Sequence, residues 1–323
     1  MERMKVFVTR EILPEGIEIL KKNFDVEVWP EYAPPSREVL KEKIKDADAV
    51  LTMLSDKMDA DMINSAPKLK IIAQLAVGFD NIDLKTAKER GIYVTNTPDV
   101  LTDASADFSF AQMLAVSRRV VEADKYVRAD KWKVAWHPKM MLGGTLRGTT
   151  LGIIGAGRIG QAMAKRGKGF DMKIIYYNRT AKPEFEKECG AKRVDLDTLL
   201  KESDYVSIHV PLNDQTRALI NAEKLALMKE SAYLISNARG PVIDEKALYN
   251  ALKNHKIAGA ALDVFCTEPA PANNPLFELD NIVVAPHISS ANTETRTKMS
   301  VICANNITAV LMGKEPQYIL VGR

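Results

Sequence analysis

The strongest chemical signal in the chain is a glycine-rich run with the spacing G-x-G-x-x-G, Gly155-Ala156-Gly157-Arg158-Ile159-Gly160. An apolar stretch at residues 151–154 precedes it and a helical pattern follows it. This strand–turn–helix context binds the pyrophosphate of a dinucleotide. The first glycine permits the tight turn, the second lets a pyrophosphate approach the backbone, and the third lets the helix pack on the sheet. The helix start then presents unpaired N–H groups to the anion, so we expect a dinucleotide site here.

The end of the next predicted strand, residues 173–177, bears on which dinucleotide is bound. NAD-selective folds place Asp or Glu about 20 residues beyond the glycines, where the carboxylate accepts from the ribose. This chain instead has Asn178, Arg179 and Thr180. Arg179 can pair with a 2′-phosphate and its neighbours can donate hydrogen bonds, although a solvated surface arginine is the alternative. The sequence favours NADP(H), with NAD(H) also accepted.

Arg239 and His287 each follow a predicted strand, at the edge where ligands of open α/β sheets bind. The guanidinium of Arg239 suits a carboxylate that lies beside a carbonyl, and the alternative is a surface arginine at a strand end. Histidine can both give and take a proton near neutral pH. Glu268 lies just beyond the preceding strand, so its carboxylate can meet the ring of His287. These residues are the candidate catalytic groups.

The elements that must position these groups fall into two series. Strands are predicted at residues 5–9, 26–29, 49–54, 70–73 and 92–95, with helices from Pro14 and over 37–46. After Thr97-Pro98-Asp99 one long helix is predicted over about 103–128. Strands then recur at residues 151–154, 173–177, 205–209, 232–237, 258–263 and 281–285, followed by a last helix at 291–312 with no strand after it.

This alternation predicts an α/β protein with two doubly wound parallel-sheet domains and a cleft between them. The smaller, flavodoxin-like substrate domain is expected to be discontinuous, at residues 1–99 and 289–323, because the last helix can return to it. The Rossmann-type dinucleotide domain is expected at residues 100–288. A length of 323 residues suits two domains.

Composition excludes several classes of protein. Net charge is +3 and charged residues make up 27%, so no nucleic-acid partner is expected. No apolar run reaches the ~18 residues of a membrane span. Cys189, Cys266 and Cys303 have neither metal-ligand nor redox spacing, which predicts no metal site and a reducing, cytoplasmic location.

Several further motifs occur in the order found in D-2-hydroxyacid dehydrogenases. They are Val77-Gly78-Phe79-Asp80-Asn81-Ile82-Asp83, Asn96-Thr97-Pro98-Asp99-Val100-Leu101-Thr102, Asn237-Ala238-Arg239-Gly240, Asp263-Val264-Phe265-Cys266-Thr267-Glu268-Pro269 and Pro286-His287-Ile288. The chain resembles that family from end to end, and within it the glyoxylate reductase and hydroxypyruvate reductase branch. The resemblance implies NAD(P)H-dependent reduction of a small 2-keto acid to the D-2-hydroxy acid, glyoxylate to glycolate or hydroxypyruvate to D-glycerate. Gln74 and Ser289 depart from the residues usual in the branch.

The resemblance also implies individual roles. Arg239 binds and polarises the substrate, His287 is the acid/base, and Glu268 supports His287. The implied substrate side comprises Leu54, Ser55, the backbone N–H groups of Val77 and Gly78, and Trp136. Implied cofactor contacts are Thr102, Gly155, Gly157, Arg158, Ile159, Gly160, Asn178, Arg179, Thr180, His209, Val210, Pro211, Asn237, Ala238, Asp263 and His287. A turn or capping role is the alternative for Asp263, and a core position is the alternative for Trp136.

A homodimer is expected by the same resemblance, with the loop around Trp136 reaching into the partner subunit. A D-lactate or D-3-phosphoglycerate dehydrogenase is an alternative enzyme. A non-catalytic NAD(H)-sensing protein is the alternative from another class, and measurable turnover distinguishes it from an enzyme.

Overall fold

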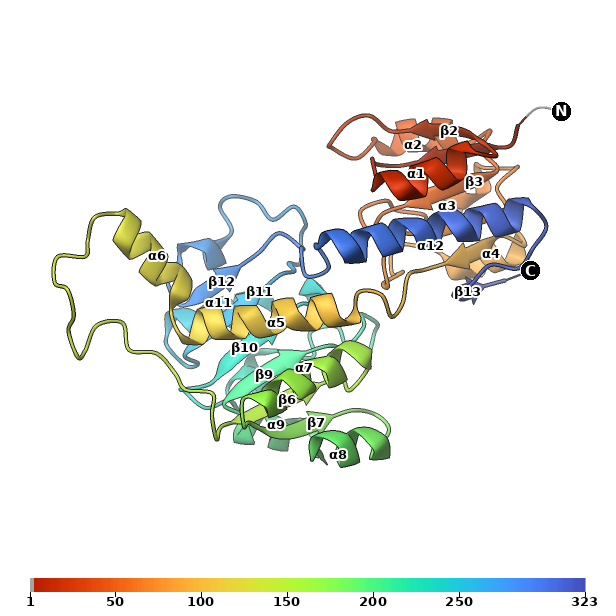
Figure 1. The fold of residues 1–323 in the computed structure, drawn as a ribbon. Helices are drawn as coiled ribbons and strands as arrows, with labels where there is room; N and C mark the ends of the chain where they lie inside the picture. Colours follow the sequence, from red (N-terminus) through yellow and green to blue (C-terminus); the bar gives the residue numbers. More distant parts are fainter. Residues whose placement is uncertain (1–2, 323) are drawn as a thin grey trace. The chain divides into compact units, whose positions relative to one another are not determined.

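A computed structural model describes residues 3–322, and contacts divide the chain into two compact units (Figure 1). Unit 1 comprises Met1–Leu101 and Ala291–Arg323, and unit 2 comprises Thr102–Ser290. Each crossing of the chain between the units therefore falls two residues later than the sequence pattern suggested.

Unit 1 is built on a sheet of six strands in the order β13-β5-β4-β3-β1-β2. Strands β1 to β5 are parallel to one another and have the flavodoxin-like order. Its elements are β1 (Lys5–Val8), α1 (Pro14–Lys21), β2 (Asp25–Val28), α2 (Arg37–Ile44), β3 (Ala49–Thr52), α3 (Ala60–Asn64), β4 (Ile71–Gln74), α4 (Leu84–Glu89), β5 (Tyr93–Thr95), α12 (Thr293–Leu311) and β13 (Ile319–Val321).

The C-terminal segment corrects one expectation, because a strand does follow the last helix. Strand β13 pairs antiparallel with β5, so the sheet of unit 1 is not wholly parallel. Helix α12 packs against α1 and β4. A Cβ atom on Gly16 would lie 2.8 Å from the carbonyl oxygen of Ser300, so a glycine is what lets α1 and α12 approach this closely.

Unit 2 is built on seven parallel strands in the order β12-β11-β10-β9-β6-β7-β8, the Rossmann arrangement. Its elements are α5 (Thr102–Ser117), α6 (Val120–Arg128), β6 (Thr150–Ile154), α7 (Arg158–Gly169), β7 (Lys173–Tyr177), α8 (Pro183–Cys189), β8 (Lys192–Arg193), α9 (Leu196–Glu202), β9 (Tyr205–Ile208), α10 (Ala222–Leu225), β10 (Tyr233–Ser236), the 3-10 helix η1 (Gly240–Val242), α11 (Glu245–Lys253), β11 (Gly259–Leu262), the 3-10 helix η2 (Pro275–Glu278) and β12 (Ile282–Val284).

Two features of unit 2 differ from the sequence prediction. The single helix expected over 103–128 is two helices, because Arg119 adopts a left-handed backbone conformation with φ 56° between α5 and α6. The two-residue strand β8 was not predicted, since Lys192 and Arg193 are both exposed and carry no apolar signal.

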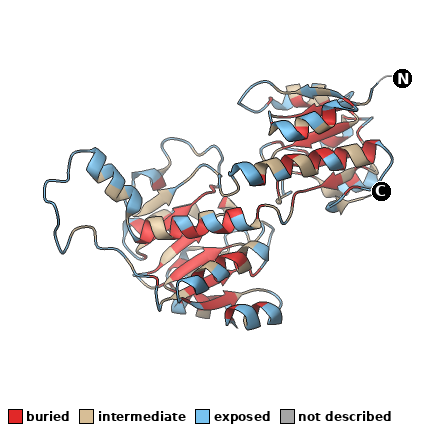
Figure 2. Ribbon diagram, viewed as in Figure 1, coloured by how far each residue is buried: buried red, intermediate tan, exposed pale blue. Residues whose placement is uncertain are grey.

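The core of each unit lies on both faces of its sheet (Figure 2). Every residue of β3, β4, β9 and β11 is buried, as expected for parallel strands covered by helices on both sides. A ligand can therefore be reached only from the loops that follow the carboxyl ends of these strands. None of the helices within residues 3–322 is both long and apolar enough to cross a membrane.

Candidate active site

The register of unit 2 brings the carboxyl ends of five strands level with one another. Successive strands end in the aligned series Ile154, Ile208, Ser236, Leu262 and Val284. The glycine run, His209, Asn237 and Asp263 follow directly, so they leave the sheet at the same edge. This edge gathers residues that are far apart in the sequence.

The glycine run adopts the conformation that its predicted role requires. Gly155 has φ 97°, and a Cβ atom there would lie 2.8 Å from the carbonyl carbon of His209. A Cβ atom on Gly160 would lie 2.1 Å from the carbonyl oxygen of Gly155. At Gly157, in contrast, a Cβ atom would meet nothing within 4 Å, and no side chain caps α7. The open face of Gly157 and the uncapped start of α7 fit a pyrophosphate.

The loop after β7 is held by Arg193, an arginine whose place in the sequence gives no sign of this role. Arg193 on β8 donates to the carbonyl oxygens of Asn178 and Arg179, at 3.1 and 2.7 Å. The side chain of Asn178 donates to the carbonyl oxygen of Thr180 at 2.9 Å. Because Arg193 lies on a strand with no apolar pattern, only the pairing of β8 with β7 reveals that it fixes this loop.

The ring of His287 and the carboxylate of Glu268 meet as predicted from their positions after neighbouring strands. Nδ1 of His287 lies 2.7 Å from Oε2 of Glu268, and the other oxygen of Glu268 accepts from the amide of Phe265 at 2.9 Å. Burial raises the pKa of Glu268, but the hydrogen bond and charge of His287, the Phe265 amide and the charge of Arg239 outweigh it. The net pKa of Glu268 is lowered, so this carboxylate is an acceptor that fixes the ring of His287.

Asp263 fixes the backbone that carries His287. The Asp263 carbonyl accepts from the amide of His287 at 2.9 Å, and its two carboxylate oxygens accept from the amides of Ile288 and Ser289, each at 2.8 Å. His287 has φ 54°, in the left-handed region that residues other than glycine adopt uncommonly. Burial raises the pKa of Asp263, while these amides and His287 oppose part of that rise. Asp263 therefore has the turn role that was the alternative to a cofactor contact, because its carboxylate accepts from the two amides of this turn.

The segment from Asn237 to Gly240 brings Arg239 near this pair. Gly240 packs so tightly that a Cβ atom would lie 1.9 Å from the carbonyl carbon of Phe265. The charge of Arg239 lowers the pKa of Glu268, and its Nη1 donates to the carbonyl oxygen of Ala238 at 2.8 Å. Both polar atoms of the buried Asn237 amide lack a hydrogen-bond partner among residues 3–322. Such an amide fits a ligand with its own donors and acceptors, as a nicotinamide carboxamide has.

His209 has the character of a half-buried, neutral imidazole. Burial lowers its pKa to about 4, and Nε2 lies 2.8 Å from Oγ of Ser207. A ring that stays uncharged at neutral pH, and that is bonded to a strand residue, supports its assignment beside the cofactor loop in preference to acid/base catalysis.

Among the other predicted residues, Arg158 and Ile159 begin α7, and Val210 and Pro211 follow His209 after β9. Leu54 and Ser55 follow β3, and Val77 and Gly78 follow β4, all in unit 1. Thr102 begins α5. Trp136 is 76% exposed, so the alternative of a core tryptophan is wrong.

Residues 3–322 contain no cluster of three or more His, Cys, Asp or Glu side chains that could hold a metal ion.

The amides of Val77 and Gly78 are oriented by their neighbours. The amide of Thr97 donates to the carbonyl oxygen of Ala76 at 2.9 Å. The side chain of Asn96 donates to the carbonyl oxygen of Val77 at 2.8 Å. Because each peptide unit is planar, fixing these two carbonyls also fixes the N–H groups of Val77 and Gly78. Within the described residues neither N–H has an acceptor, so both are available to an anion.

Comparison with known proteins agrees with this geometry. Residues 110–289 match the model of the D-isomer specific 2-hydroxyacid dehydrogenase NAD-binding domain, a segment that holds the glycine run, Arg239, Glu268 and His287. The chain belongs to the D-isomer specific 2-hydroxyacid dehydrogenase family. The family prediction is therefore confirmed, and with it an NAD(P)-dependent oxidoreductase.

Relatives of this dehydrogenase cover nearly its whole length. Glyoxylate reductase of Thermococcus litoralis is 55% identical over 97% of this chain and 95% of its own. Glyoxylate reductase of Korarchaeum cryptofilum is 54% identical over 97% and 94%. The NADPH-dependent glyoxylate/hydroxypyruvate reductase of Sinorhizobium meliloti, solved with NADP and malonate, is 30% identical with a TM-score of 0.86 over 100% of this chain and 99% of that one.

The lowered pKa of Glu268 makes the contribution of this dehydrogenase's carboxylate–imidazole pair to stability depend on pH. A carboxyl group with a depressed pKa in the folded state stabilises the fold above its unfolded value, near 4.5, and loses this effect as pH falls through the folded pKa. We expect Glu268→Gln to lower Tm at neutral pH, and the difference from the unmutated chain to shrink progressively below about pH 4.5. Thermal unfolding across this range checks it, with Glu223→Gln on α10 as an exposed control. A difference in Tm for Glu268→Gln that stays constant with pH would contradict the assignment.

Proposed function

We propose that this dehydrogenase reduces glyoxylate and hydroxypyruvate to glycolate and D-glycerate, with NADPH preferred and NADH accepted. The observation that carries the proposal is the hydrogen bond between His287 and Glu268, with Arg239 near it, on the sheet edge that also carries the glycine run. The names of the archaeal and bacterial relatives support the substrate class.

The proposed mechanism divides the work among three side chains. The guanidinium of Arg239 donates to the substrate carboxylate and to the carbonyl oxygen, which polarises the carbonyl. Nδ1 of His287 donates to the ionised Glu268, so Nε2 is the nitrogen that faces the substrate. Protonated Nε2 gives its proton to the developing alkoxide, and the imidazole is left neutral and still bonded to Glu268.

Other residues bind and orient. A bound dinucleotide would supply a hydride from its nicotinamide ring. The glycine run and α7 would hold its pyrophosphate, and Asn237 would meet the nicotinamide carboxamide. The N–H groups of Val77 and Gly78 would donate to the substrate carboxylate, with Leu54 and Ser55 beside it. Asp263 keeps His287 in its turn through the amides of Ile288 and Ser289, and so acts on catalysis through His287.

Arg239→Ala should remove binding that is strongest in the transition state. We expect kcat/KM for glyoxylate to fall by about 10²–10³-fold, as for loss of one preorganised donor to a developing oxyanion. Steady-state kinetics with glyoxylate, hydroxypyruvate and pyruvate measures this. The control is Arg147→Ala, which removes an 84% exposed arginine paired with Asp171. Near-normal turnover by Arg239→Ala would refute the role of Arg239.

The preference for NADPH is proposed to depend on Arg179. No carboxylate occupies residues 178–180, and Arg193 holds the backbone of Asn178 and Arg179. We expect Arg179→Ala to raise KM for NADPH about tenfold and to leave KM for NADH nearly unchanged, because a charge-assisted pair to the 2′-phosphate is lost. Lys201→Ala at the end of α9 removes the same charge elsewhere in unit 2 as a control. Higher efficiency of the unmutated enzyme with NADH than with NADPH would contradict the proposal.

A homodimer is proposed from the surface of α6 and the segment that follows it. Helix α6 has no buried residue, and this region extends away from the sheet of unit 2 (Figures 1 and 2). Its exposed apolar side chains are Val120, Val121, Val127, Trp132, Val134, Trp136 and Leu142. A soluble monomer rarely exposes so many together, so a second copy is the proposed cover and Trp136 would lie near its site.

Light scattering on a sizing column tests the dimer. We expect a particle of twice the chain mass of 35.8 kDa. Trp132→Glu combined with Val134→Glu should give a single-chain mass, because two charges cannot be buried unpaired in an apolar interface. A single-chain mass for the unmutated protein would contradict the proposal.

A further inference from the structure

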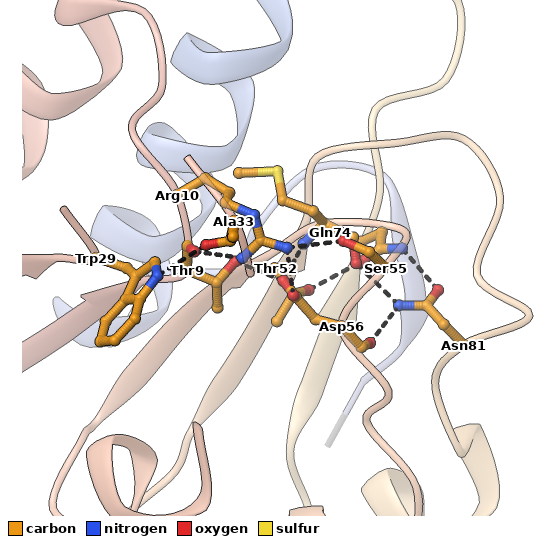
Figure 3. A network of polar contacts seen from close by, with 10 residues as sticks. Thr9, Arg10, Trp29, Ala33, Thr52, Ser55, Asp56, Gln74 and Asn81 are labelled. Atoms are coloured by element: carbon orange, nitrogen blue, oxygen red, sulfur yellow. Dashed lines mark hydrogen bonds and ion pairs between the residues drawn. The ribbon is translucent and has the colours of Figure 1, made fainter. Parts of the chain in front are cut away.

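A buried carboxylate occupies the carboxyl edge of the sheet in unit 1. Asp56 is 3% exposed, and its oxygens accept from the hydroxyl of Thr9 at 2.5 Å, the amide of Met53 at 2.7 Å and the guanidinium of Arg10 at 3.0 Å (Figure 3). A buried charge is tolerated only when it is paired and hydrogen-bonded in this way. The position is therefore built with several partners, on a loop next to the implied substrate residue Ser55.

Arg10 connects Asp56 to Ser55. Its Nη2 donates to Oγ of Ser55 at 2.8 Å as well as to Asp56, and its Nη1 donates to the carbonyl oxygen of Thr9 at 2.5 Å. Because Oγ of Ser55 accepts from Arg10, its own hydrogen is left to donate. Ser55 is exposed, so that hydrogen can meet an oxygen of a ligand.

Asn81 and Gln74 connect the same loop to the one that carries Val77 and Gly78. The side chain of Asn81 donates to the carbonyl oxygens of Met53 and Asp56, at 3.1 and 2.8 Å. It accepts from Nε2 of Gln74 at 2.7 Å. Gln74 also accepts from the hydroxyl of Thr52 at 2.7 Å (Figure 3). It donates to the carbonyl oxygen of Gly78 at 3.3 Å.

We infer that Asp56 is a positioning residue for the 2-keto acid. With Arg10, Asn81 and Gln74 it sets the loops 53–57 and 75–82 in one arrangement, so that the Ser55 hydroxyl and the N–H groups of Val77 and Gly78 can address one carboxylate. This inference rests on the proposed function. It also gives a place to Gln74, whose long amide spans the distance between Thr52 and Asn81.

The same sheet offers a matched control at its opposite edge. Asp48 precedes β3, pairs with Lys70 at 2.9 Å and accepts from the amide of Lys5 at 2.9 Å. Asp48→Asn thus also removes a charge that accepts a backbone amide and pairs with a cation in unit 1. It does so away from the loops 53–57 and 75–82.

The experiment measures kcat, KM for glyoxylate and the dissociation constant of NADPH for Asp56→Asn, Asn81→Ala and Asp48→Asn in the full chain, with Tm for each. In Asp56→Asn and Asn81→Ala we expect KM for glyoxylate to rise about tenfold, with kcat changed less than about threefold and NADPH affinity unchanged. Asp48→Asn should lower Tm and leave KM unchanged.

The outcomes separate the inference from the proposed function. An unchanged KM in folded Asp56→Asn and Asn81→Ala, or an equal rise in Asp48→Asn, would overturn the positioning role while the reductase assignment stands. Asn81→Ala decides if Asp56→Asn does not fold, because it uncouples the two loops without leaving a buried charge unpaired. No turnover of glyoxylate by the unmutated chain would overturn both.

Discussion

The hydrogen bond between Glu268 and Nδ1 of His287 is the interaction on which the proposed chemistry depends. It leaves Nε2 as the only ring nitrogen that can exchange a proton with a substrate, and the lowered pKa of Glu268 keeps the carboxylate in the accepting form. The backbone that carries the ring has φ 54°, and the carboxylate of Asp263 accepts from the two amides that follow His287. Two carboxylates thus position His287, because Glu268 orients its ring and Asp263 orients the backbone that carries it.

In both units the parallel sheet determines where polar side chains gather. Parallel strands that end level deliver their following loops to one edge, where polar groups need not be covered by helices. In unit 2 this edge carries the glycine run, Asn237, Arg239 and His287. In unit 1 it carries Asp56 and its partners, where a buried ion pair and two carboxamides couple the loops after β3 and β4. Hydrogen bonds to charged or fully buried groups fix loop geometry more firmly than exposed ones.

The features that sequence could predict are those with a local or a repeated signal. Strand β7 was predicted with its observed bounds, Lys173–Tyr177, because it contains the compact run Ile174–Tyr177, which ends at the polar Asn178. The contact of Glu268 with His287 followed from their places after neighbouring strands. The break at Arg119 had no glycine or proline to announce it, and β13 is three residues long and exists only by pairing with β5.

The polar side chains that hold the loops could not be predicted from the sequence, because their contacts join residues that are far apart in the chain. Arg193 and Asp56 look like ordinary surface charges in the sequence, and their roles arise from strand register that brings distant residues together. Asp263 was expected to contact the cofactor, with a turn or capping role as the alternative. Its bonds to two amides depend on a turn whose left-handed residue is His287. Periodicity carries no information about any of these contacts.

The most direct test of the account is a crystal structure of the chain with NADP and oxamate, an unreactive analogue of a small 2-keto acid. The account predicts that the carbonyl oxygen of oxamate lies within about 2.7–3.1 Å of both Nε2 of His287 and a guanidinium nitrogen of Arg239, facing the nicotinamide ring. Oxamate bound with that oxygen beyond hydrogen-bond reach of both side chains would contradict it.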